Sequence, residues 1–436
     1  MPGEVRADTI GKAQLVMEAG KTVPLITRAD CEALDRADPL RRFRDRFHLP
    51  SGLIYLDGNS LGAMPKSVPA RIARLLEREW GDDLIRGWTK DGWMDLPLAV
   101  GAKIGSLIGA GEDETVVADS TSVNLFKVLG AALGLRPDRH VILSERVNFP
   151  TDLYIAQGLA SLMGGGYALR LVERSEIEAA LGSDIAVVML THADYRSGRL
   201  WDMKRITALA HQAGALTVWD FSHSAGVVPL DFDGDEADFA VGCGYKYLSG
   251  GPGAPAFLTI ARRHLQQAAI PITGWLGHAE PFAFESGFRA AEGIGRARVG
   301  TPPILSLAAL EVGVDLVREA TVPALRVKSI RQTELFAALA AQELDGFGFA
   351  LASPAAADQR GSQVSLRHER GWPITQALTA ANVIGDFRAP DIVRFGFAPL
   401  YVRYVELWDA VATLKRIMVE QQWDRPQFCA APTGVT

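Results

Sequence analysis

The chain has 436 residues, of which 48% are hydrophobic and 22% are charged. This length allows two or more domains, and the balance is ordinary for a folded globular enzyme. The formal net charge of −6 offers no overall basic surface, so we expect neither nucleic acid nor an anionic membrane as a partner. No apolar run approaches the roughly 20 residues that a membrane span needs.

We expect neither a metal site nor a secretion signal. The three cysteines, Cys31, Cys243 and Cys429, are far apart and lack the spacing of metal ligands. Their number fits a reducing cytoplasm, and Cys243 is interpreted as small apolar packing. Residues 1–8 have neither a basic start nor an apolar core, which argues against a signal peptide.

Short apolar runs alternate with amphipathic stretches between about residues 100 and 310. We expect strands at residues 116–118, 140–143, 168–172, 185–190, 216–219, 239–241 and 256–260, and helices at 123–133 and 203–213. The alternation predicts a mainly parallel seven-stranded sheet with helices on both faces. Because residues 256–260 follow their predecessor too closely for a helical crossover, we expect that strand to be antiparallel.

The remainder of the chain predicts a smaller α+β domain. A helix at residues 306–319 leads into it, and a strand is expected at residues 392–395. Further helices are expected at residues 327–344, 375–381 and 404–420.

Lys246 lies between Tyr245 and Tyr247 in the glycine-rich stretch 242–253, just after the strand predicted at 239–241. A lysine held at such a corner among aromatic rings can lose its proton more easily than a surface lysine. A lysine that forms a Schiff base needs this property. Taken alone, the stretch fits a surface lysine in a glycine turn about equally well.

A second polar cluster, with Asp220 and His223, follows the strand predicted at 216–219. In open α/β sheets, ligands bind just beyond the carboxyl ends of the strands. Taken separately, Asp220 could be a helix cap and His223 a packed core residue. Together with Lys246 they favour a pyridoxal phosphate (PLP) site, in which the aspartate keeps the pyridine nitrogen protonated and the lysine carries the cofactor.

At this point the chain resembles the kynureninase family, whose members are PLP enzymes of the aspartate-aminotransferase fold, called fold type I. The resemblance runs from about Ile26 to Phe428. The blocks at 149–152 and 274–278 are specific to kynureninases, whereas the aspartate and the lysine indicate only the superfamily. The matching blocks, in the family's order, are residues 56–62, 120–126, 148–152, 195–198, 220–223, 245–248, 274–278, 300–304 and 394–401.

The resemblance implies an organisation in four parts. Residues 1–25 are expected to be an N-terminal extension, and residues 26–60 a segment that packs on the small domain. Residues 61–310 would form the large PLP-binding domain and residues 311–436 the small C-terminal domain. The family also implies a cytoplasmic homodimer with its active site at the subunit interface.

The family's cofactor contacts match specific positions in this chain. Thr121 and Ser122, expected just before the helix at 123–133, would bind the phosphate, although an ordinary helix cap explains them as well from sequence alone. Thr301 would reach the phosphate of the neighbouring subunit. The other matching positions imply phosphate contacts by Tyr245, His223 and Trp275, stacking on the ring by Phe149, and contacts near the ring by Asp152 and Thr191.

Arg394 matches the arginine that binds the substrate's carboxylate, although a surface ion pair is the usual role of an arginine. The candidates for the aromatic end of the substrate are Ser60, Trp88, Trp275 and Leu276. Leu276 stands where many kynureninases have phenylalanine, and Gly87 and Thr89 replace the commoner serine and asparagine. These departures concern substrate preference and leave the cofactor residues intact.

The implied activity is hydrolysis of the Cβ–Cγ bond of L-kynurenine to anthranilate and L-alanine, in tryptophan catabolism and NAD biosynthesis. 3-Hydroxy-L-kynurenine, which would give 3-hydroxyanthranilate, is a second candidate substrate. Lys246 would move the α-proton, Asp220 would support the ring nitrogen, and Tyr245 would donate a proton late in the reaction.

Three other interpretations were weighed. Another fold type I activity, cysteine desulfurase or a class V aminotransferase, would share the cofactor residues, but neither Cys243 nor Cys429 suits a mobile nucleophile. The run Gly58–Gly62 satisfies G-x-S-x-G, with Ser60 as a hydrolase nucleophile, but it lies early in the chain and soon meets Pro65. A non-catalytic member of the fold would be expected to lack Lys246 or Asp220.

Overall fold

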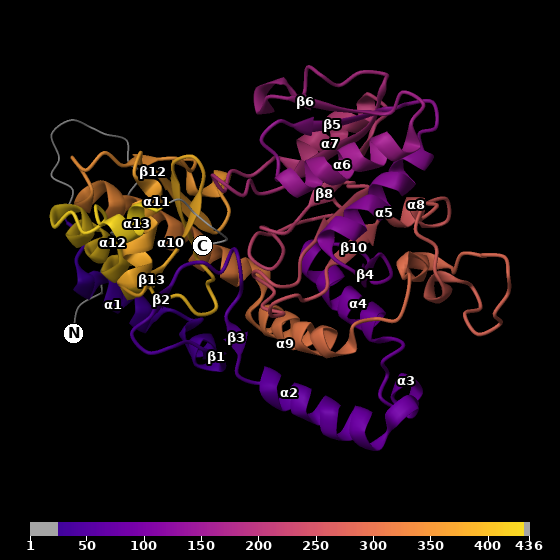
Figure 1. Cartoon of the computed structure of the whole chain (residues 1–436), viewed down its shortest axis with the longest axis horizontal. Helices are drawn as coiled ribbons and strands as arrows, with labels where there is room; N and C mark the ends of the chain where they lie inside the picture. The colour runs from indigo at the N-terminus through magenta and orange to yellow at the C-terminus, as the bar shows by residue number, and fades with distance from the viewer. Residues whose placement is uncertain (1–24, 431–436) are drawn as a thin grey trace, which may run out of the picture.

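The computed structural model describes residues 25–430, so nearly all of the expected N-terminal extension lies outside the described residues. A seven-stranded sheet, in the order β4-β10-β9-β8-β7-β5-β6, forms the centre of the larger part of the chain (Figure 1). All seven predicted strands are confirmed to within a few residues. They are β4 (Thr115–Val117), β5 (Val141–Glu145), β6 (Ala168–Val172), β7 (Ile185–Thr191), β8 (Leu216–Asp220), β9 (Phe239–Gly242) and β10 (Phe257–Ile260).

The sheet is mainly parallel, as predicted. Strands β6, β5, β7, β8 and β9 pair in parallel, whereas β10 is antiparallel to both β9 and β4. The register pairs Thr191 with Asp220 and Asp220 with Val241. The carboxyl ends of β7, β8 and β9 therefore meet at one edge, where ligands bind in sheets of this kind.

Both faces of the sheet are buried, because alternate residues of each strand point to opposite sides. On one side, Val187 and Val218 belong to a core with helices α5 (Thr121–Gly134) and α6 (Pro150–Met163). On the other side, Val188 and Trp219 join the main core with α4 (Leu96–Ile108), α7 (Met203–Gln212) and α9 (Ile304–Ala320). The expected covering of both faces by helices is confirmed.

One helix boundary near the sheet differs from the sequence-based expectation. Helix α5 begins at Thr121 and not at residue 123, because Ser120 is its N-cap and accepts a hydrogen bond from the Val123 N–H at 3.4 Å. Thr121 and Ser122 are therefore the first residues of the helix and do not precede it.

The smaller, C-terminal part has a four-stranded sheet in the order β11-β12-β15-β14. Its helix α10 begins five residues earlier than expected because Pro323 lies in the first turn, where a proline needs no N–H partner. The elements are α10 (Val322–Glu343), β11 (Ala350–Leu351), β12 (Gln363–Arg367), α11 (Gly371–Ala380), β13 (Val383–Ile384), β14 (Asp386–Arg388), β15 (Ile392–Gly396), α12 (Tyr404–Val419) and α13 (Pro426–Cys429).

The start of the described chain packs on this C-terminal part. Helix α1 (Arg28–Ala37) contacts α12, and β2 (Ile54–Tyr55) pairs in parallel with β13. The expected domain boundaries at residues 60 and 310 stay predictions. The remaining short elements are η1 (Arg41–Arg46), β1 (Phe47–His48), β3 (Met64–Pro65), α2 (Val68–Arg74), η2 (Leu75–Asp82), η3 (Leu84–Arg86), α3 (Gly87–Lys90), η4 (Arg174–Glu176), α8 (Arg262–Leu265), η5 (Trp275–Gly277), η6 (Gly293–Ala297) and η7 (Ala357–Gln359).

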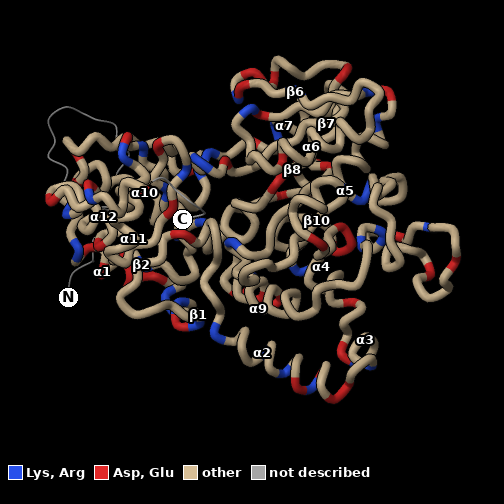
Figure 2. Tube along the Cα trace, in the orientation of Figure 1, with Lys and Arg blue, Asp and Glu red and all other residues tan. Residues whose placement is uncertain are grey.

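Charged residues of both signs are interspersed along the described chain (Figure 2). Within residues 25–430, no helix is both long enough and apolar enough to cross a membrane.

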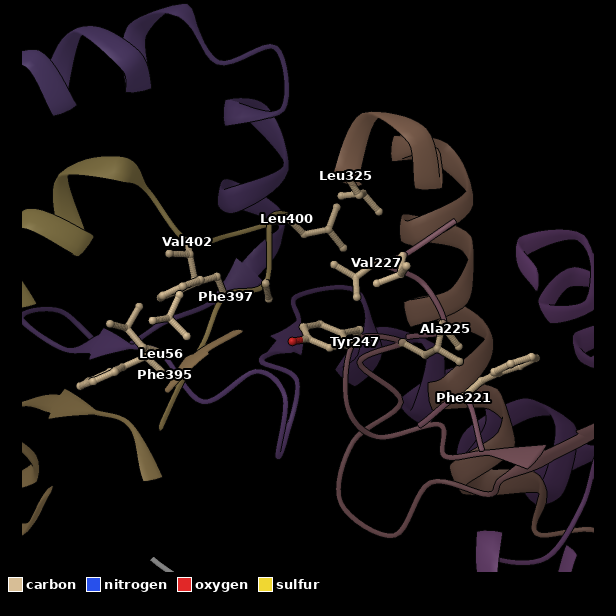
Figure 3. Packing of buried hydrophobic residues seen from close by; sticks show 14 of the residues in the cluster. Leu56, Phe221, Ala225, Val227, Tyr247, Leu325, Phe395, Phe397, Leu400 and Val402 are labelled. Atoms are coloured by element: carbon tan, nitrogen blue, oxygen red, sulfur yellow. The ribbon is translucent and has the colours of Figure 1, made fainter. Parts of the chain in front are cut away.

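The two parts meet around the ring of Tyr247. The ring belongs to one buried cluster with Phe397 and Leu400, which follow the C-terminal sheet, and with Val227, which follows β8 (Figure 3). The Tyr247 hydroxyl donates a hydrogen bond to the Ser362 carbonyl at 3.1 Å. This buried tyrosine therefore joins the large sheet region to the C-terminal sheet.

Two glycines let neighbouring backbone approach the loop that carries Lys246. A Cβ on Gly313, in α9, would lie 2.0 Å from the Leu248 carbonyl oxygen. A Cβ on Gly62 would lie 2.3 Å from the Lys246 carbonyl oxygen. Real Cβ atoms do not approach so closely, so any larger residue must displace this loop.

The substitution Gly313→Ala should lower the melting temperature, because the added methyl overpacks the loop at a cost of about 1–3 kcal/mol. Gly158, in α6, has open space around its Cα and is the matched control. There the same change should stabilise the protein by about 0.5–1 kcal/mol, since alanine favours the helix. Thermal unfolding should show a lower melting temperature for Gly313→Ala and a higher one for Gly158→Ala. The same change in melting temperature in both variants would contradict the close approach of α9 to the loop.

Candidate active site

Lys246 is nearly buried, with 9% of its surface exposed, at the corner that follows β9. Its Nζ lies 3.2 Å from His223 Nε2. The centres of the Phe149 and Tyr245 rings lie 5.9 and 5.8 Å from the same nitrogen. The expectation that both flanking tyrosines surround the lysine is wrong for Tyr247, because that ring packs into the core between the two parts of the chain.

Backbone hydrogen bonds hold this corner in place. The Gly62 N–H donates to the Tyr245 carbonyl at 2.8 Å, and the Ser249 N–H donates to the Lys246 carbonyl at 3.0 Å. The position of the amine therefore depends on the N-terminal segment as well as on β9.

Two buried carboxyl groups lie near the amine. Asp220, the last residue of β8, accepts a hydrogen bond from the Ser222 N–H at 2.7 Å. Asp152, in the first turn of α6, accepts one from the Thr191 hydroxyl at 3.2 Å. Burial raises the pKa of both carboxyls. The charge of Asp220 raises the pKa of Asp152 further, whereas Lys246 opposes the shift of both.

The neighbouring His223 and Tyr245 are both uncharged at neutral pH. Burial, followed by the charge of Lys246, lowers the pKa of His223 well below its usual range. The nearby Cys243 thiol and burial raise the pKa of Tyr245. His223 can therefore accept a hydrogen bond from Lys246, and the Tyr245 phenol keeps its proton.

The first turn of α5 begins with the hydroxyl-bearing residues Thr121 and Ser122. The first N–H groups of a helix have no partner within the helix and bind anions well. Below this turn, the buried Lys127 pairs with Asp119 and donates to the Ala297 carbonyl at 2.8 Å. The segment that leads to Thr301 is thus tied to the start of α5.

Arg394, in β15, is 1% exposed and forms a two-pronged ion pair with Asp386, which lies opposite it in β14. Arg394 Nε donates to Asp386 Oδ1 at 2.7 Å, and Arg394 Nη2 also donates to this carboxylate. Ser60 Oγ lies 2.9 Å from the same Nη2, and Nη1 donates to the Tyr195 carbonyl. Ser60 therefore lies beside the guanidinium, and its place at the aromatic end of a substrate stays a prediction.

Within residues 25–430, four of the expected site residues form no side-chain hydrogen bond with Lys246 or Arg394. Trp88 packs edge-on against Trp93, and Leu276 is buried. Trp275 is 41% exposed and packs edge-on against Phe282. Thr301 is exposed just before α9. Within the described chain, neither Trp88 nor Trp275 has a hydrogen bond or ring contact with the residues around Lys246.

Three further residues, for which the sequence predicts no role, contact these groups. Asn148 accepts a hydrogen bond from the Thr191 hydroxyl and one from the Phe149 N–H at 2.8 Å. Asp386 holds Arg394, and the Tyr195 ring packs edge-on against Phe149 at 5.3 Å. The signal that could have identified Asp386 is an acid and an arginine placed four residues to either side of Pro390, as in a short hairpin.

The donor set suits a flat, anionic cofactor that carries an aldehyde. It combines a buried amine, an aromatic face beside it, a buried carboxylate at a strand end and a helix N-terminus with two hydroxyl groups. Together with the sheet order, these residues define the PLP-dependent enzymes of fold type I.

Comparison with known proteins identifies one family within the PLP-dependent enzymes of fold type I. A curated kynureninase of Burkholderia mallei is 48% identical over 407 residues, which cover 92% of this chain and 98% of the relative. A kynureninase of Pseudomonas fluorescens is 47% identical over 409 residues, covering 93% and 98% of the two chains. A family model described as the kynureninase C-terminal domain matches residues 325–414. The chain belongs to the kynureninase family.

Solved structures confirm the fold. A mutant of C-DES with glycine covalently linked to its PLP cofactor has a TM-score of 0.74 at 18% identity and covers 85% of this chain and 98% of its own. A cysteine desulfurase of Thermococcus onnurineus NA1 has a TM-score of 0.72 at 19% identity and covers 87% and 98%. At such low sequence identity, the structural similarity supports only the fold. It therefore gives no support to the desulfurase alternative over the kynureninase family.

The serine hydrolase interpretation fails on local geometry. A nucleophile elbow opens directly into a helix, whereas Ser60 is followed by the short strand β3. Its hydroxyl donates to Asp386 Oδ2 at 2.9 Å and accepts from Arg394. The Asp386 carboxylate that accepts from it is paired with Arg394 and Arg388, which lower its pKa and make it too weak a base to activate a serine.

The two tyrosines beside Lys246 should respond differently to loss of the hydroxyl. Tyr247→Phe removes one of two donors to the buried Ser362 carbonyl, which still accepts from the Phe397 N–H at 2.8 Å, and should cost about 0.5–1.5 kcal/mol of stability. Tyr245→Phe, at the half-buried site face, should change stability by less than about 0.5 kcal/mol. Thermal unfolding checks the contrast, and a larger loss in Tyr245→Phe would contradict the placement of the two rings.

Proposed function

We propose that this protein hydrolyses the Cβ–Cγ bond of L-kynurenine, giving anthranilate and L-alanine, with PLP bound at Lys246. The observation that carries the proposal is the buried amine beside His223 and the strand-end carboxylate, in a chain 47–48% identical to kynureninases over nearly its full length. 3-Hydroxy-L-kynurenine is the second candidate substrate. The setting proposed for the reaction is tryptophan catabolism in the cytoplasm.

We assign the cofactor contacts to residues around the amine, to the first turn of α5 and to the exposed segment that carries Trp275. PLP supplies an aldehyde and an electron-accepting ring when it is bound. Lys246 attaches it, Asp220 keeps a proton at the ring nitrogen, and Phe149 lies against the ring. Thr121, Ser122, Tyr245, His223 and, from the exposed segment, Trp275 bind the phosphate. Asp152 and Thr191 contact the ring edge, which the hydrogen bond between them supports.

Arg394 binds the substrate's α-carboxylate through the edge of its guanidinium that does not face Asp386. Ser60 lies beside that edge, so we assign its hydroxyl to the carboxylate end of the substrate. This revises the sequence-based assignment of Ser60 to the aromatic end. Trp88, Trp275 and Leu276 stay the candidates for the aromatic ring.

These three residues and Thr301 belong to a site completed by a second copy of the chain. The exposure of Trp275 and Thr301 in the single chain supports this arrangement. An aromatic side chain that is exposed on one copy and faces the site of another is common at interfaces. We therefore propose a homodimer with its active sites between the subunits.

We assign each proton transfer to a residue that can accept or donate the proton in question. Lys246 takes the α-proton, and its amine is returned to attach the cofactor when alanine leaves. Water adds to the ketone carbon, the Cβ–Cγ bond breaks, and anthranilate departs. The protonated phenol of Tyr245 donates during this cleavage, because its raised pKa keeps the proton available.

Replacement of Lys246 tests the proposal directly. Lys246→Ala should abolish anthranilate release and the visible absorption of the bound cofactor, since no amine remains to hold it or to move the α-proton. Lys103→Ala, which removes a partly exposed lysine paired with Glu311, is the control and should retain both signals. Normal turnover by Lys246→Ala would refute the assignment.

Product analysis separates the competing activities. Incubation with L-kynurenine should release anthranilate and L-alanine in equal amounts, whereas a desulfurase or an aminotransferase would release no anthranilate. The ratio of kcat/KM for L-kynurenine to that for 3-hydroxy-L-kynurenine then identifies the preferred substrate.

A further inference from the structure

Four charged side chains gather where the N-terminal segment meets the C-terminal sheet. They are Asp57, which follows β2, Asp386 and Arg388 in β14, and Arg394 in β15. Arg388 Nη2 lies 2.7 Å from Asp386 Oδ2, so Asp386 pairs with both arginines. We call these four residues the carboxylate cluster.

Asp57 is the less firmly held of the two acids. Within residues 25–430, its carboxyl forms no ion pair closer than 4.0 Å, whereas Asp386 forms two. Asn59 connects it to the cluster. With its amide oriented to satisfy both neighbours, Asn59 donates to Asp57 Oδ1 at 3.3 Å and accepts from Arg394 Nε at 3.1 Å.

Charge balance then sets a condition on substrate binding. With both acids ionised, the two arginines and two carboxylates cancel. A third carboxylate, from the substrate, would leave one uncompensated negative charge in a largely buried place, which is costly. Neutralising one acid removes this cost, and Asp57 is the one without an arginine directly on it.

We propose that Asp57 takes up one proton when the α-carboxylate of an amino-acid ligand binds Arg394. The cluster thereby exchanges one negative charge for another and stays neutral. The inference rests on the proposed function, because it takes Arg394 as the carboxylate site.

The protonation behaviour of the two acids supports this division. Burial and the charge of Asp386 raise the pKa of Asp57 to about 7, with Arg394 opposing the shift. Burial also disfavours ionised Asp386, but its ion pairs with Arg394 and Arg388 lower its pKa overall. Asp57 is thus poised to change its charge near neutral pH, whereas Asp386 stays ionised.

The other titratable groups around Asp57 do not compete for this proton. Burial raises the pKa of Tyr55, Tyr247 and Tyr401, so all three phenols stay neutral. Arg388 and Arg394 stay charged. Among these facing groups, Asp57 alone titrates near pH 7.

The protonation of Asp57 sets how the dissociation constant for the carboxylate ligand changes with pH. Below about pH 7 the free enzyme already carries the proton on Asp57, and its affinity for the carboxylate is highest. Above that pH a proton must be taken from solution on binding. The dissociation constant should then rise by up to about tenfold per pH unit, until the pKa of Asp57 in the complex is reached.

Calorimetry on the holoenzyme measures the proton directly. The probe is 4-(2-aminophenyl)-4-oxobutanoate, which has the substrate's ring, ketone and carboxylate but no α-amine, so no amine proton complicates the count. Titrations at one pH above 7, in two buffers of different ionisation enthalpy, should show uptake of about half a proton or more. The corresponding amide, which lacks the charge, should show none.

Variants assign the proton to its residue. Asp57→Asn imitates the neutral acid and should bind the probe with no proton uptake and with a dissociation constant that is flat above pH 7. Asp57→Glu should restore both the uptake and the slope. The melting temperature of each variant confirms that it is folded.

The outcomes separate this inference from the proposed function. If the wild-type holoenzyme releases anthranilate but binds the probe without proton uptake, the inference is wrong and the function stands. The inference also fails if Asp57→Asn keeps the wild-type uptake. If uptake occurs and depends on Asp57 but no anthranilate is formed, the inference stands and the function fails. If the probe does not bind, Arg394 is not the carboxylate site and the inference falls with it.

Discussion

The structure depends on the placement of one backbone corner between the two parts of the chain. The loop after β9 is held by a hydrogen bond from Gly62, by the close approach of Gly313 in α9 and by the buried ring of Tyr247. These contacts come from the N-terminal segment, the large region and the C-terminal sheet. A buried lysine can act only if its amine is held at a fixed distance from the groups around it. The position of the Lys246 amine therefore depends on the N-terminal segment, the large region and the C-terminal sheet together.

The buried acids of the candidate site lie in two places and behave differently in each. Asp152 and Asp220 lie beside a single lysine, and burial raises the pKa of both. Asp386 lies between two arginines, and its pKa is lowered despite burial. The number of cations per acid therefore decides the charge state, and the fold sets that number by pairing β14 with β15.

Much of the fold could be predicted because each strand of the large sheet is a short apolar run that ends in polar residues. The antiparallel β10 followed from the shortness of its connection. The start of α10 was missed because Pro323 was not recognised as a first-turn residue. The contacts of Ser60 with Asp386 and Arg394 could not be predicted, because they depend on the pairing of β2 with β13, more than 300 residues apart. Trp88 and Thr301 reach no site in one chain, so their roles stay predictions.

The burial of Tyr247 has a consequence for motion. Its ring forms part of the packed boundary between the large sheet and the C-terminal sheet, and its backbone is bonded to that of Lys246. A rotation of one part against the other would have to slide around this ring, since close-packed interiors do not deform continuously. Any displacement of one part against the other would therefore be passed to Lys246 through a single peptide link.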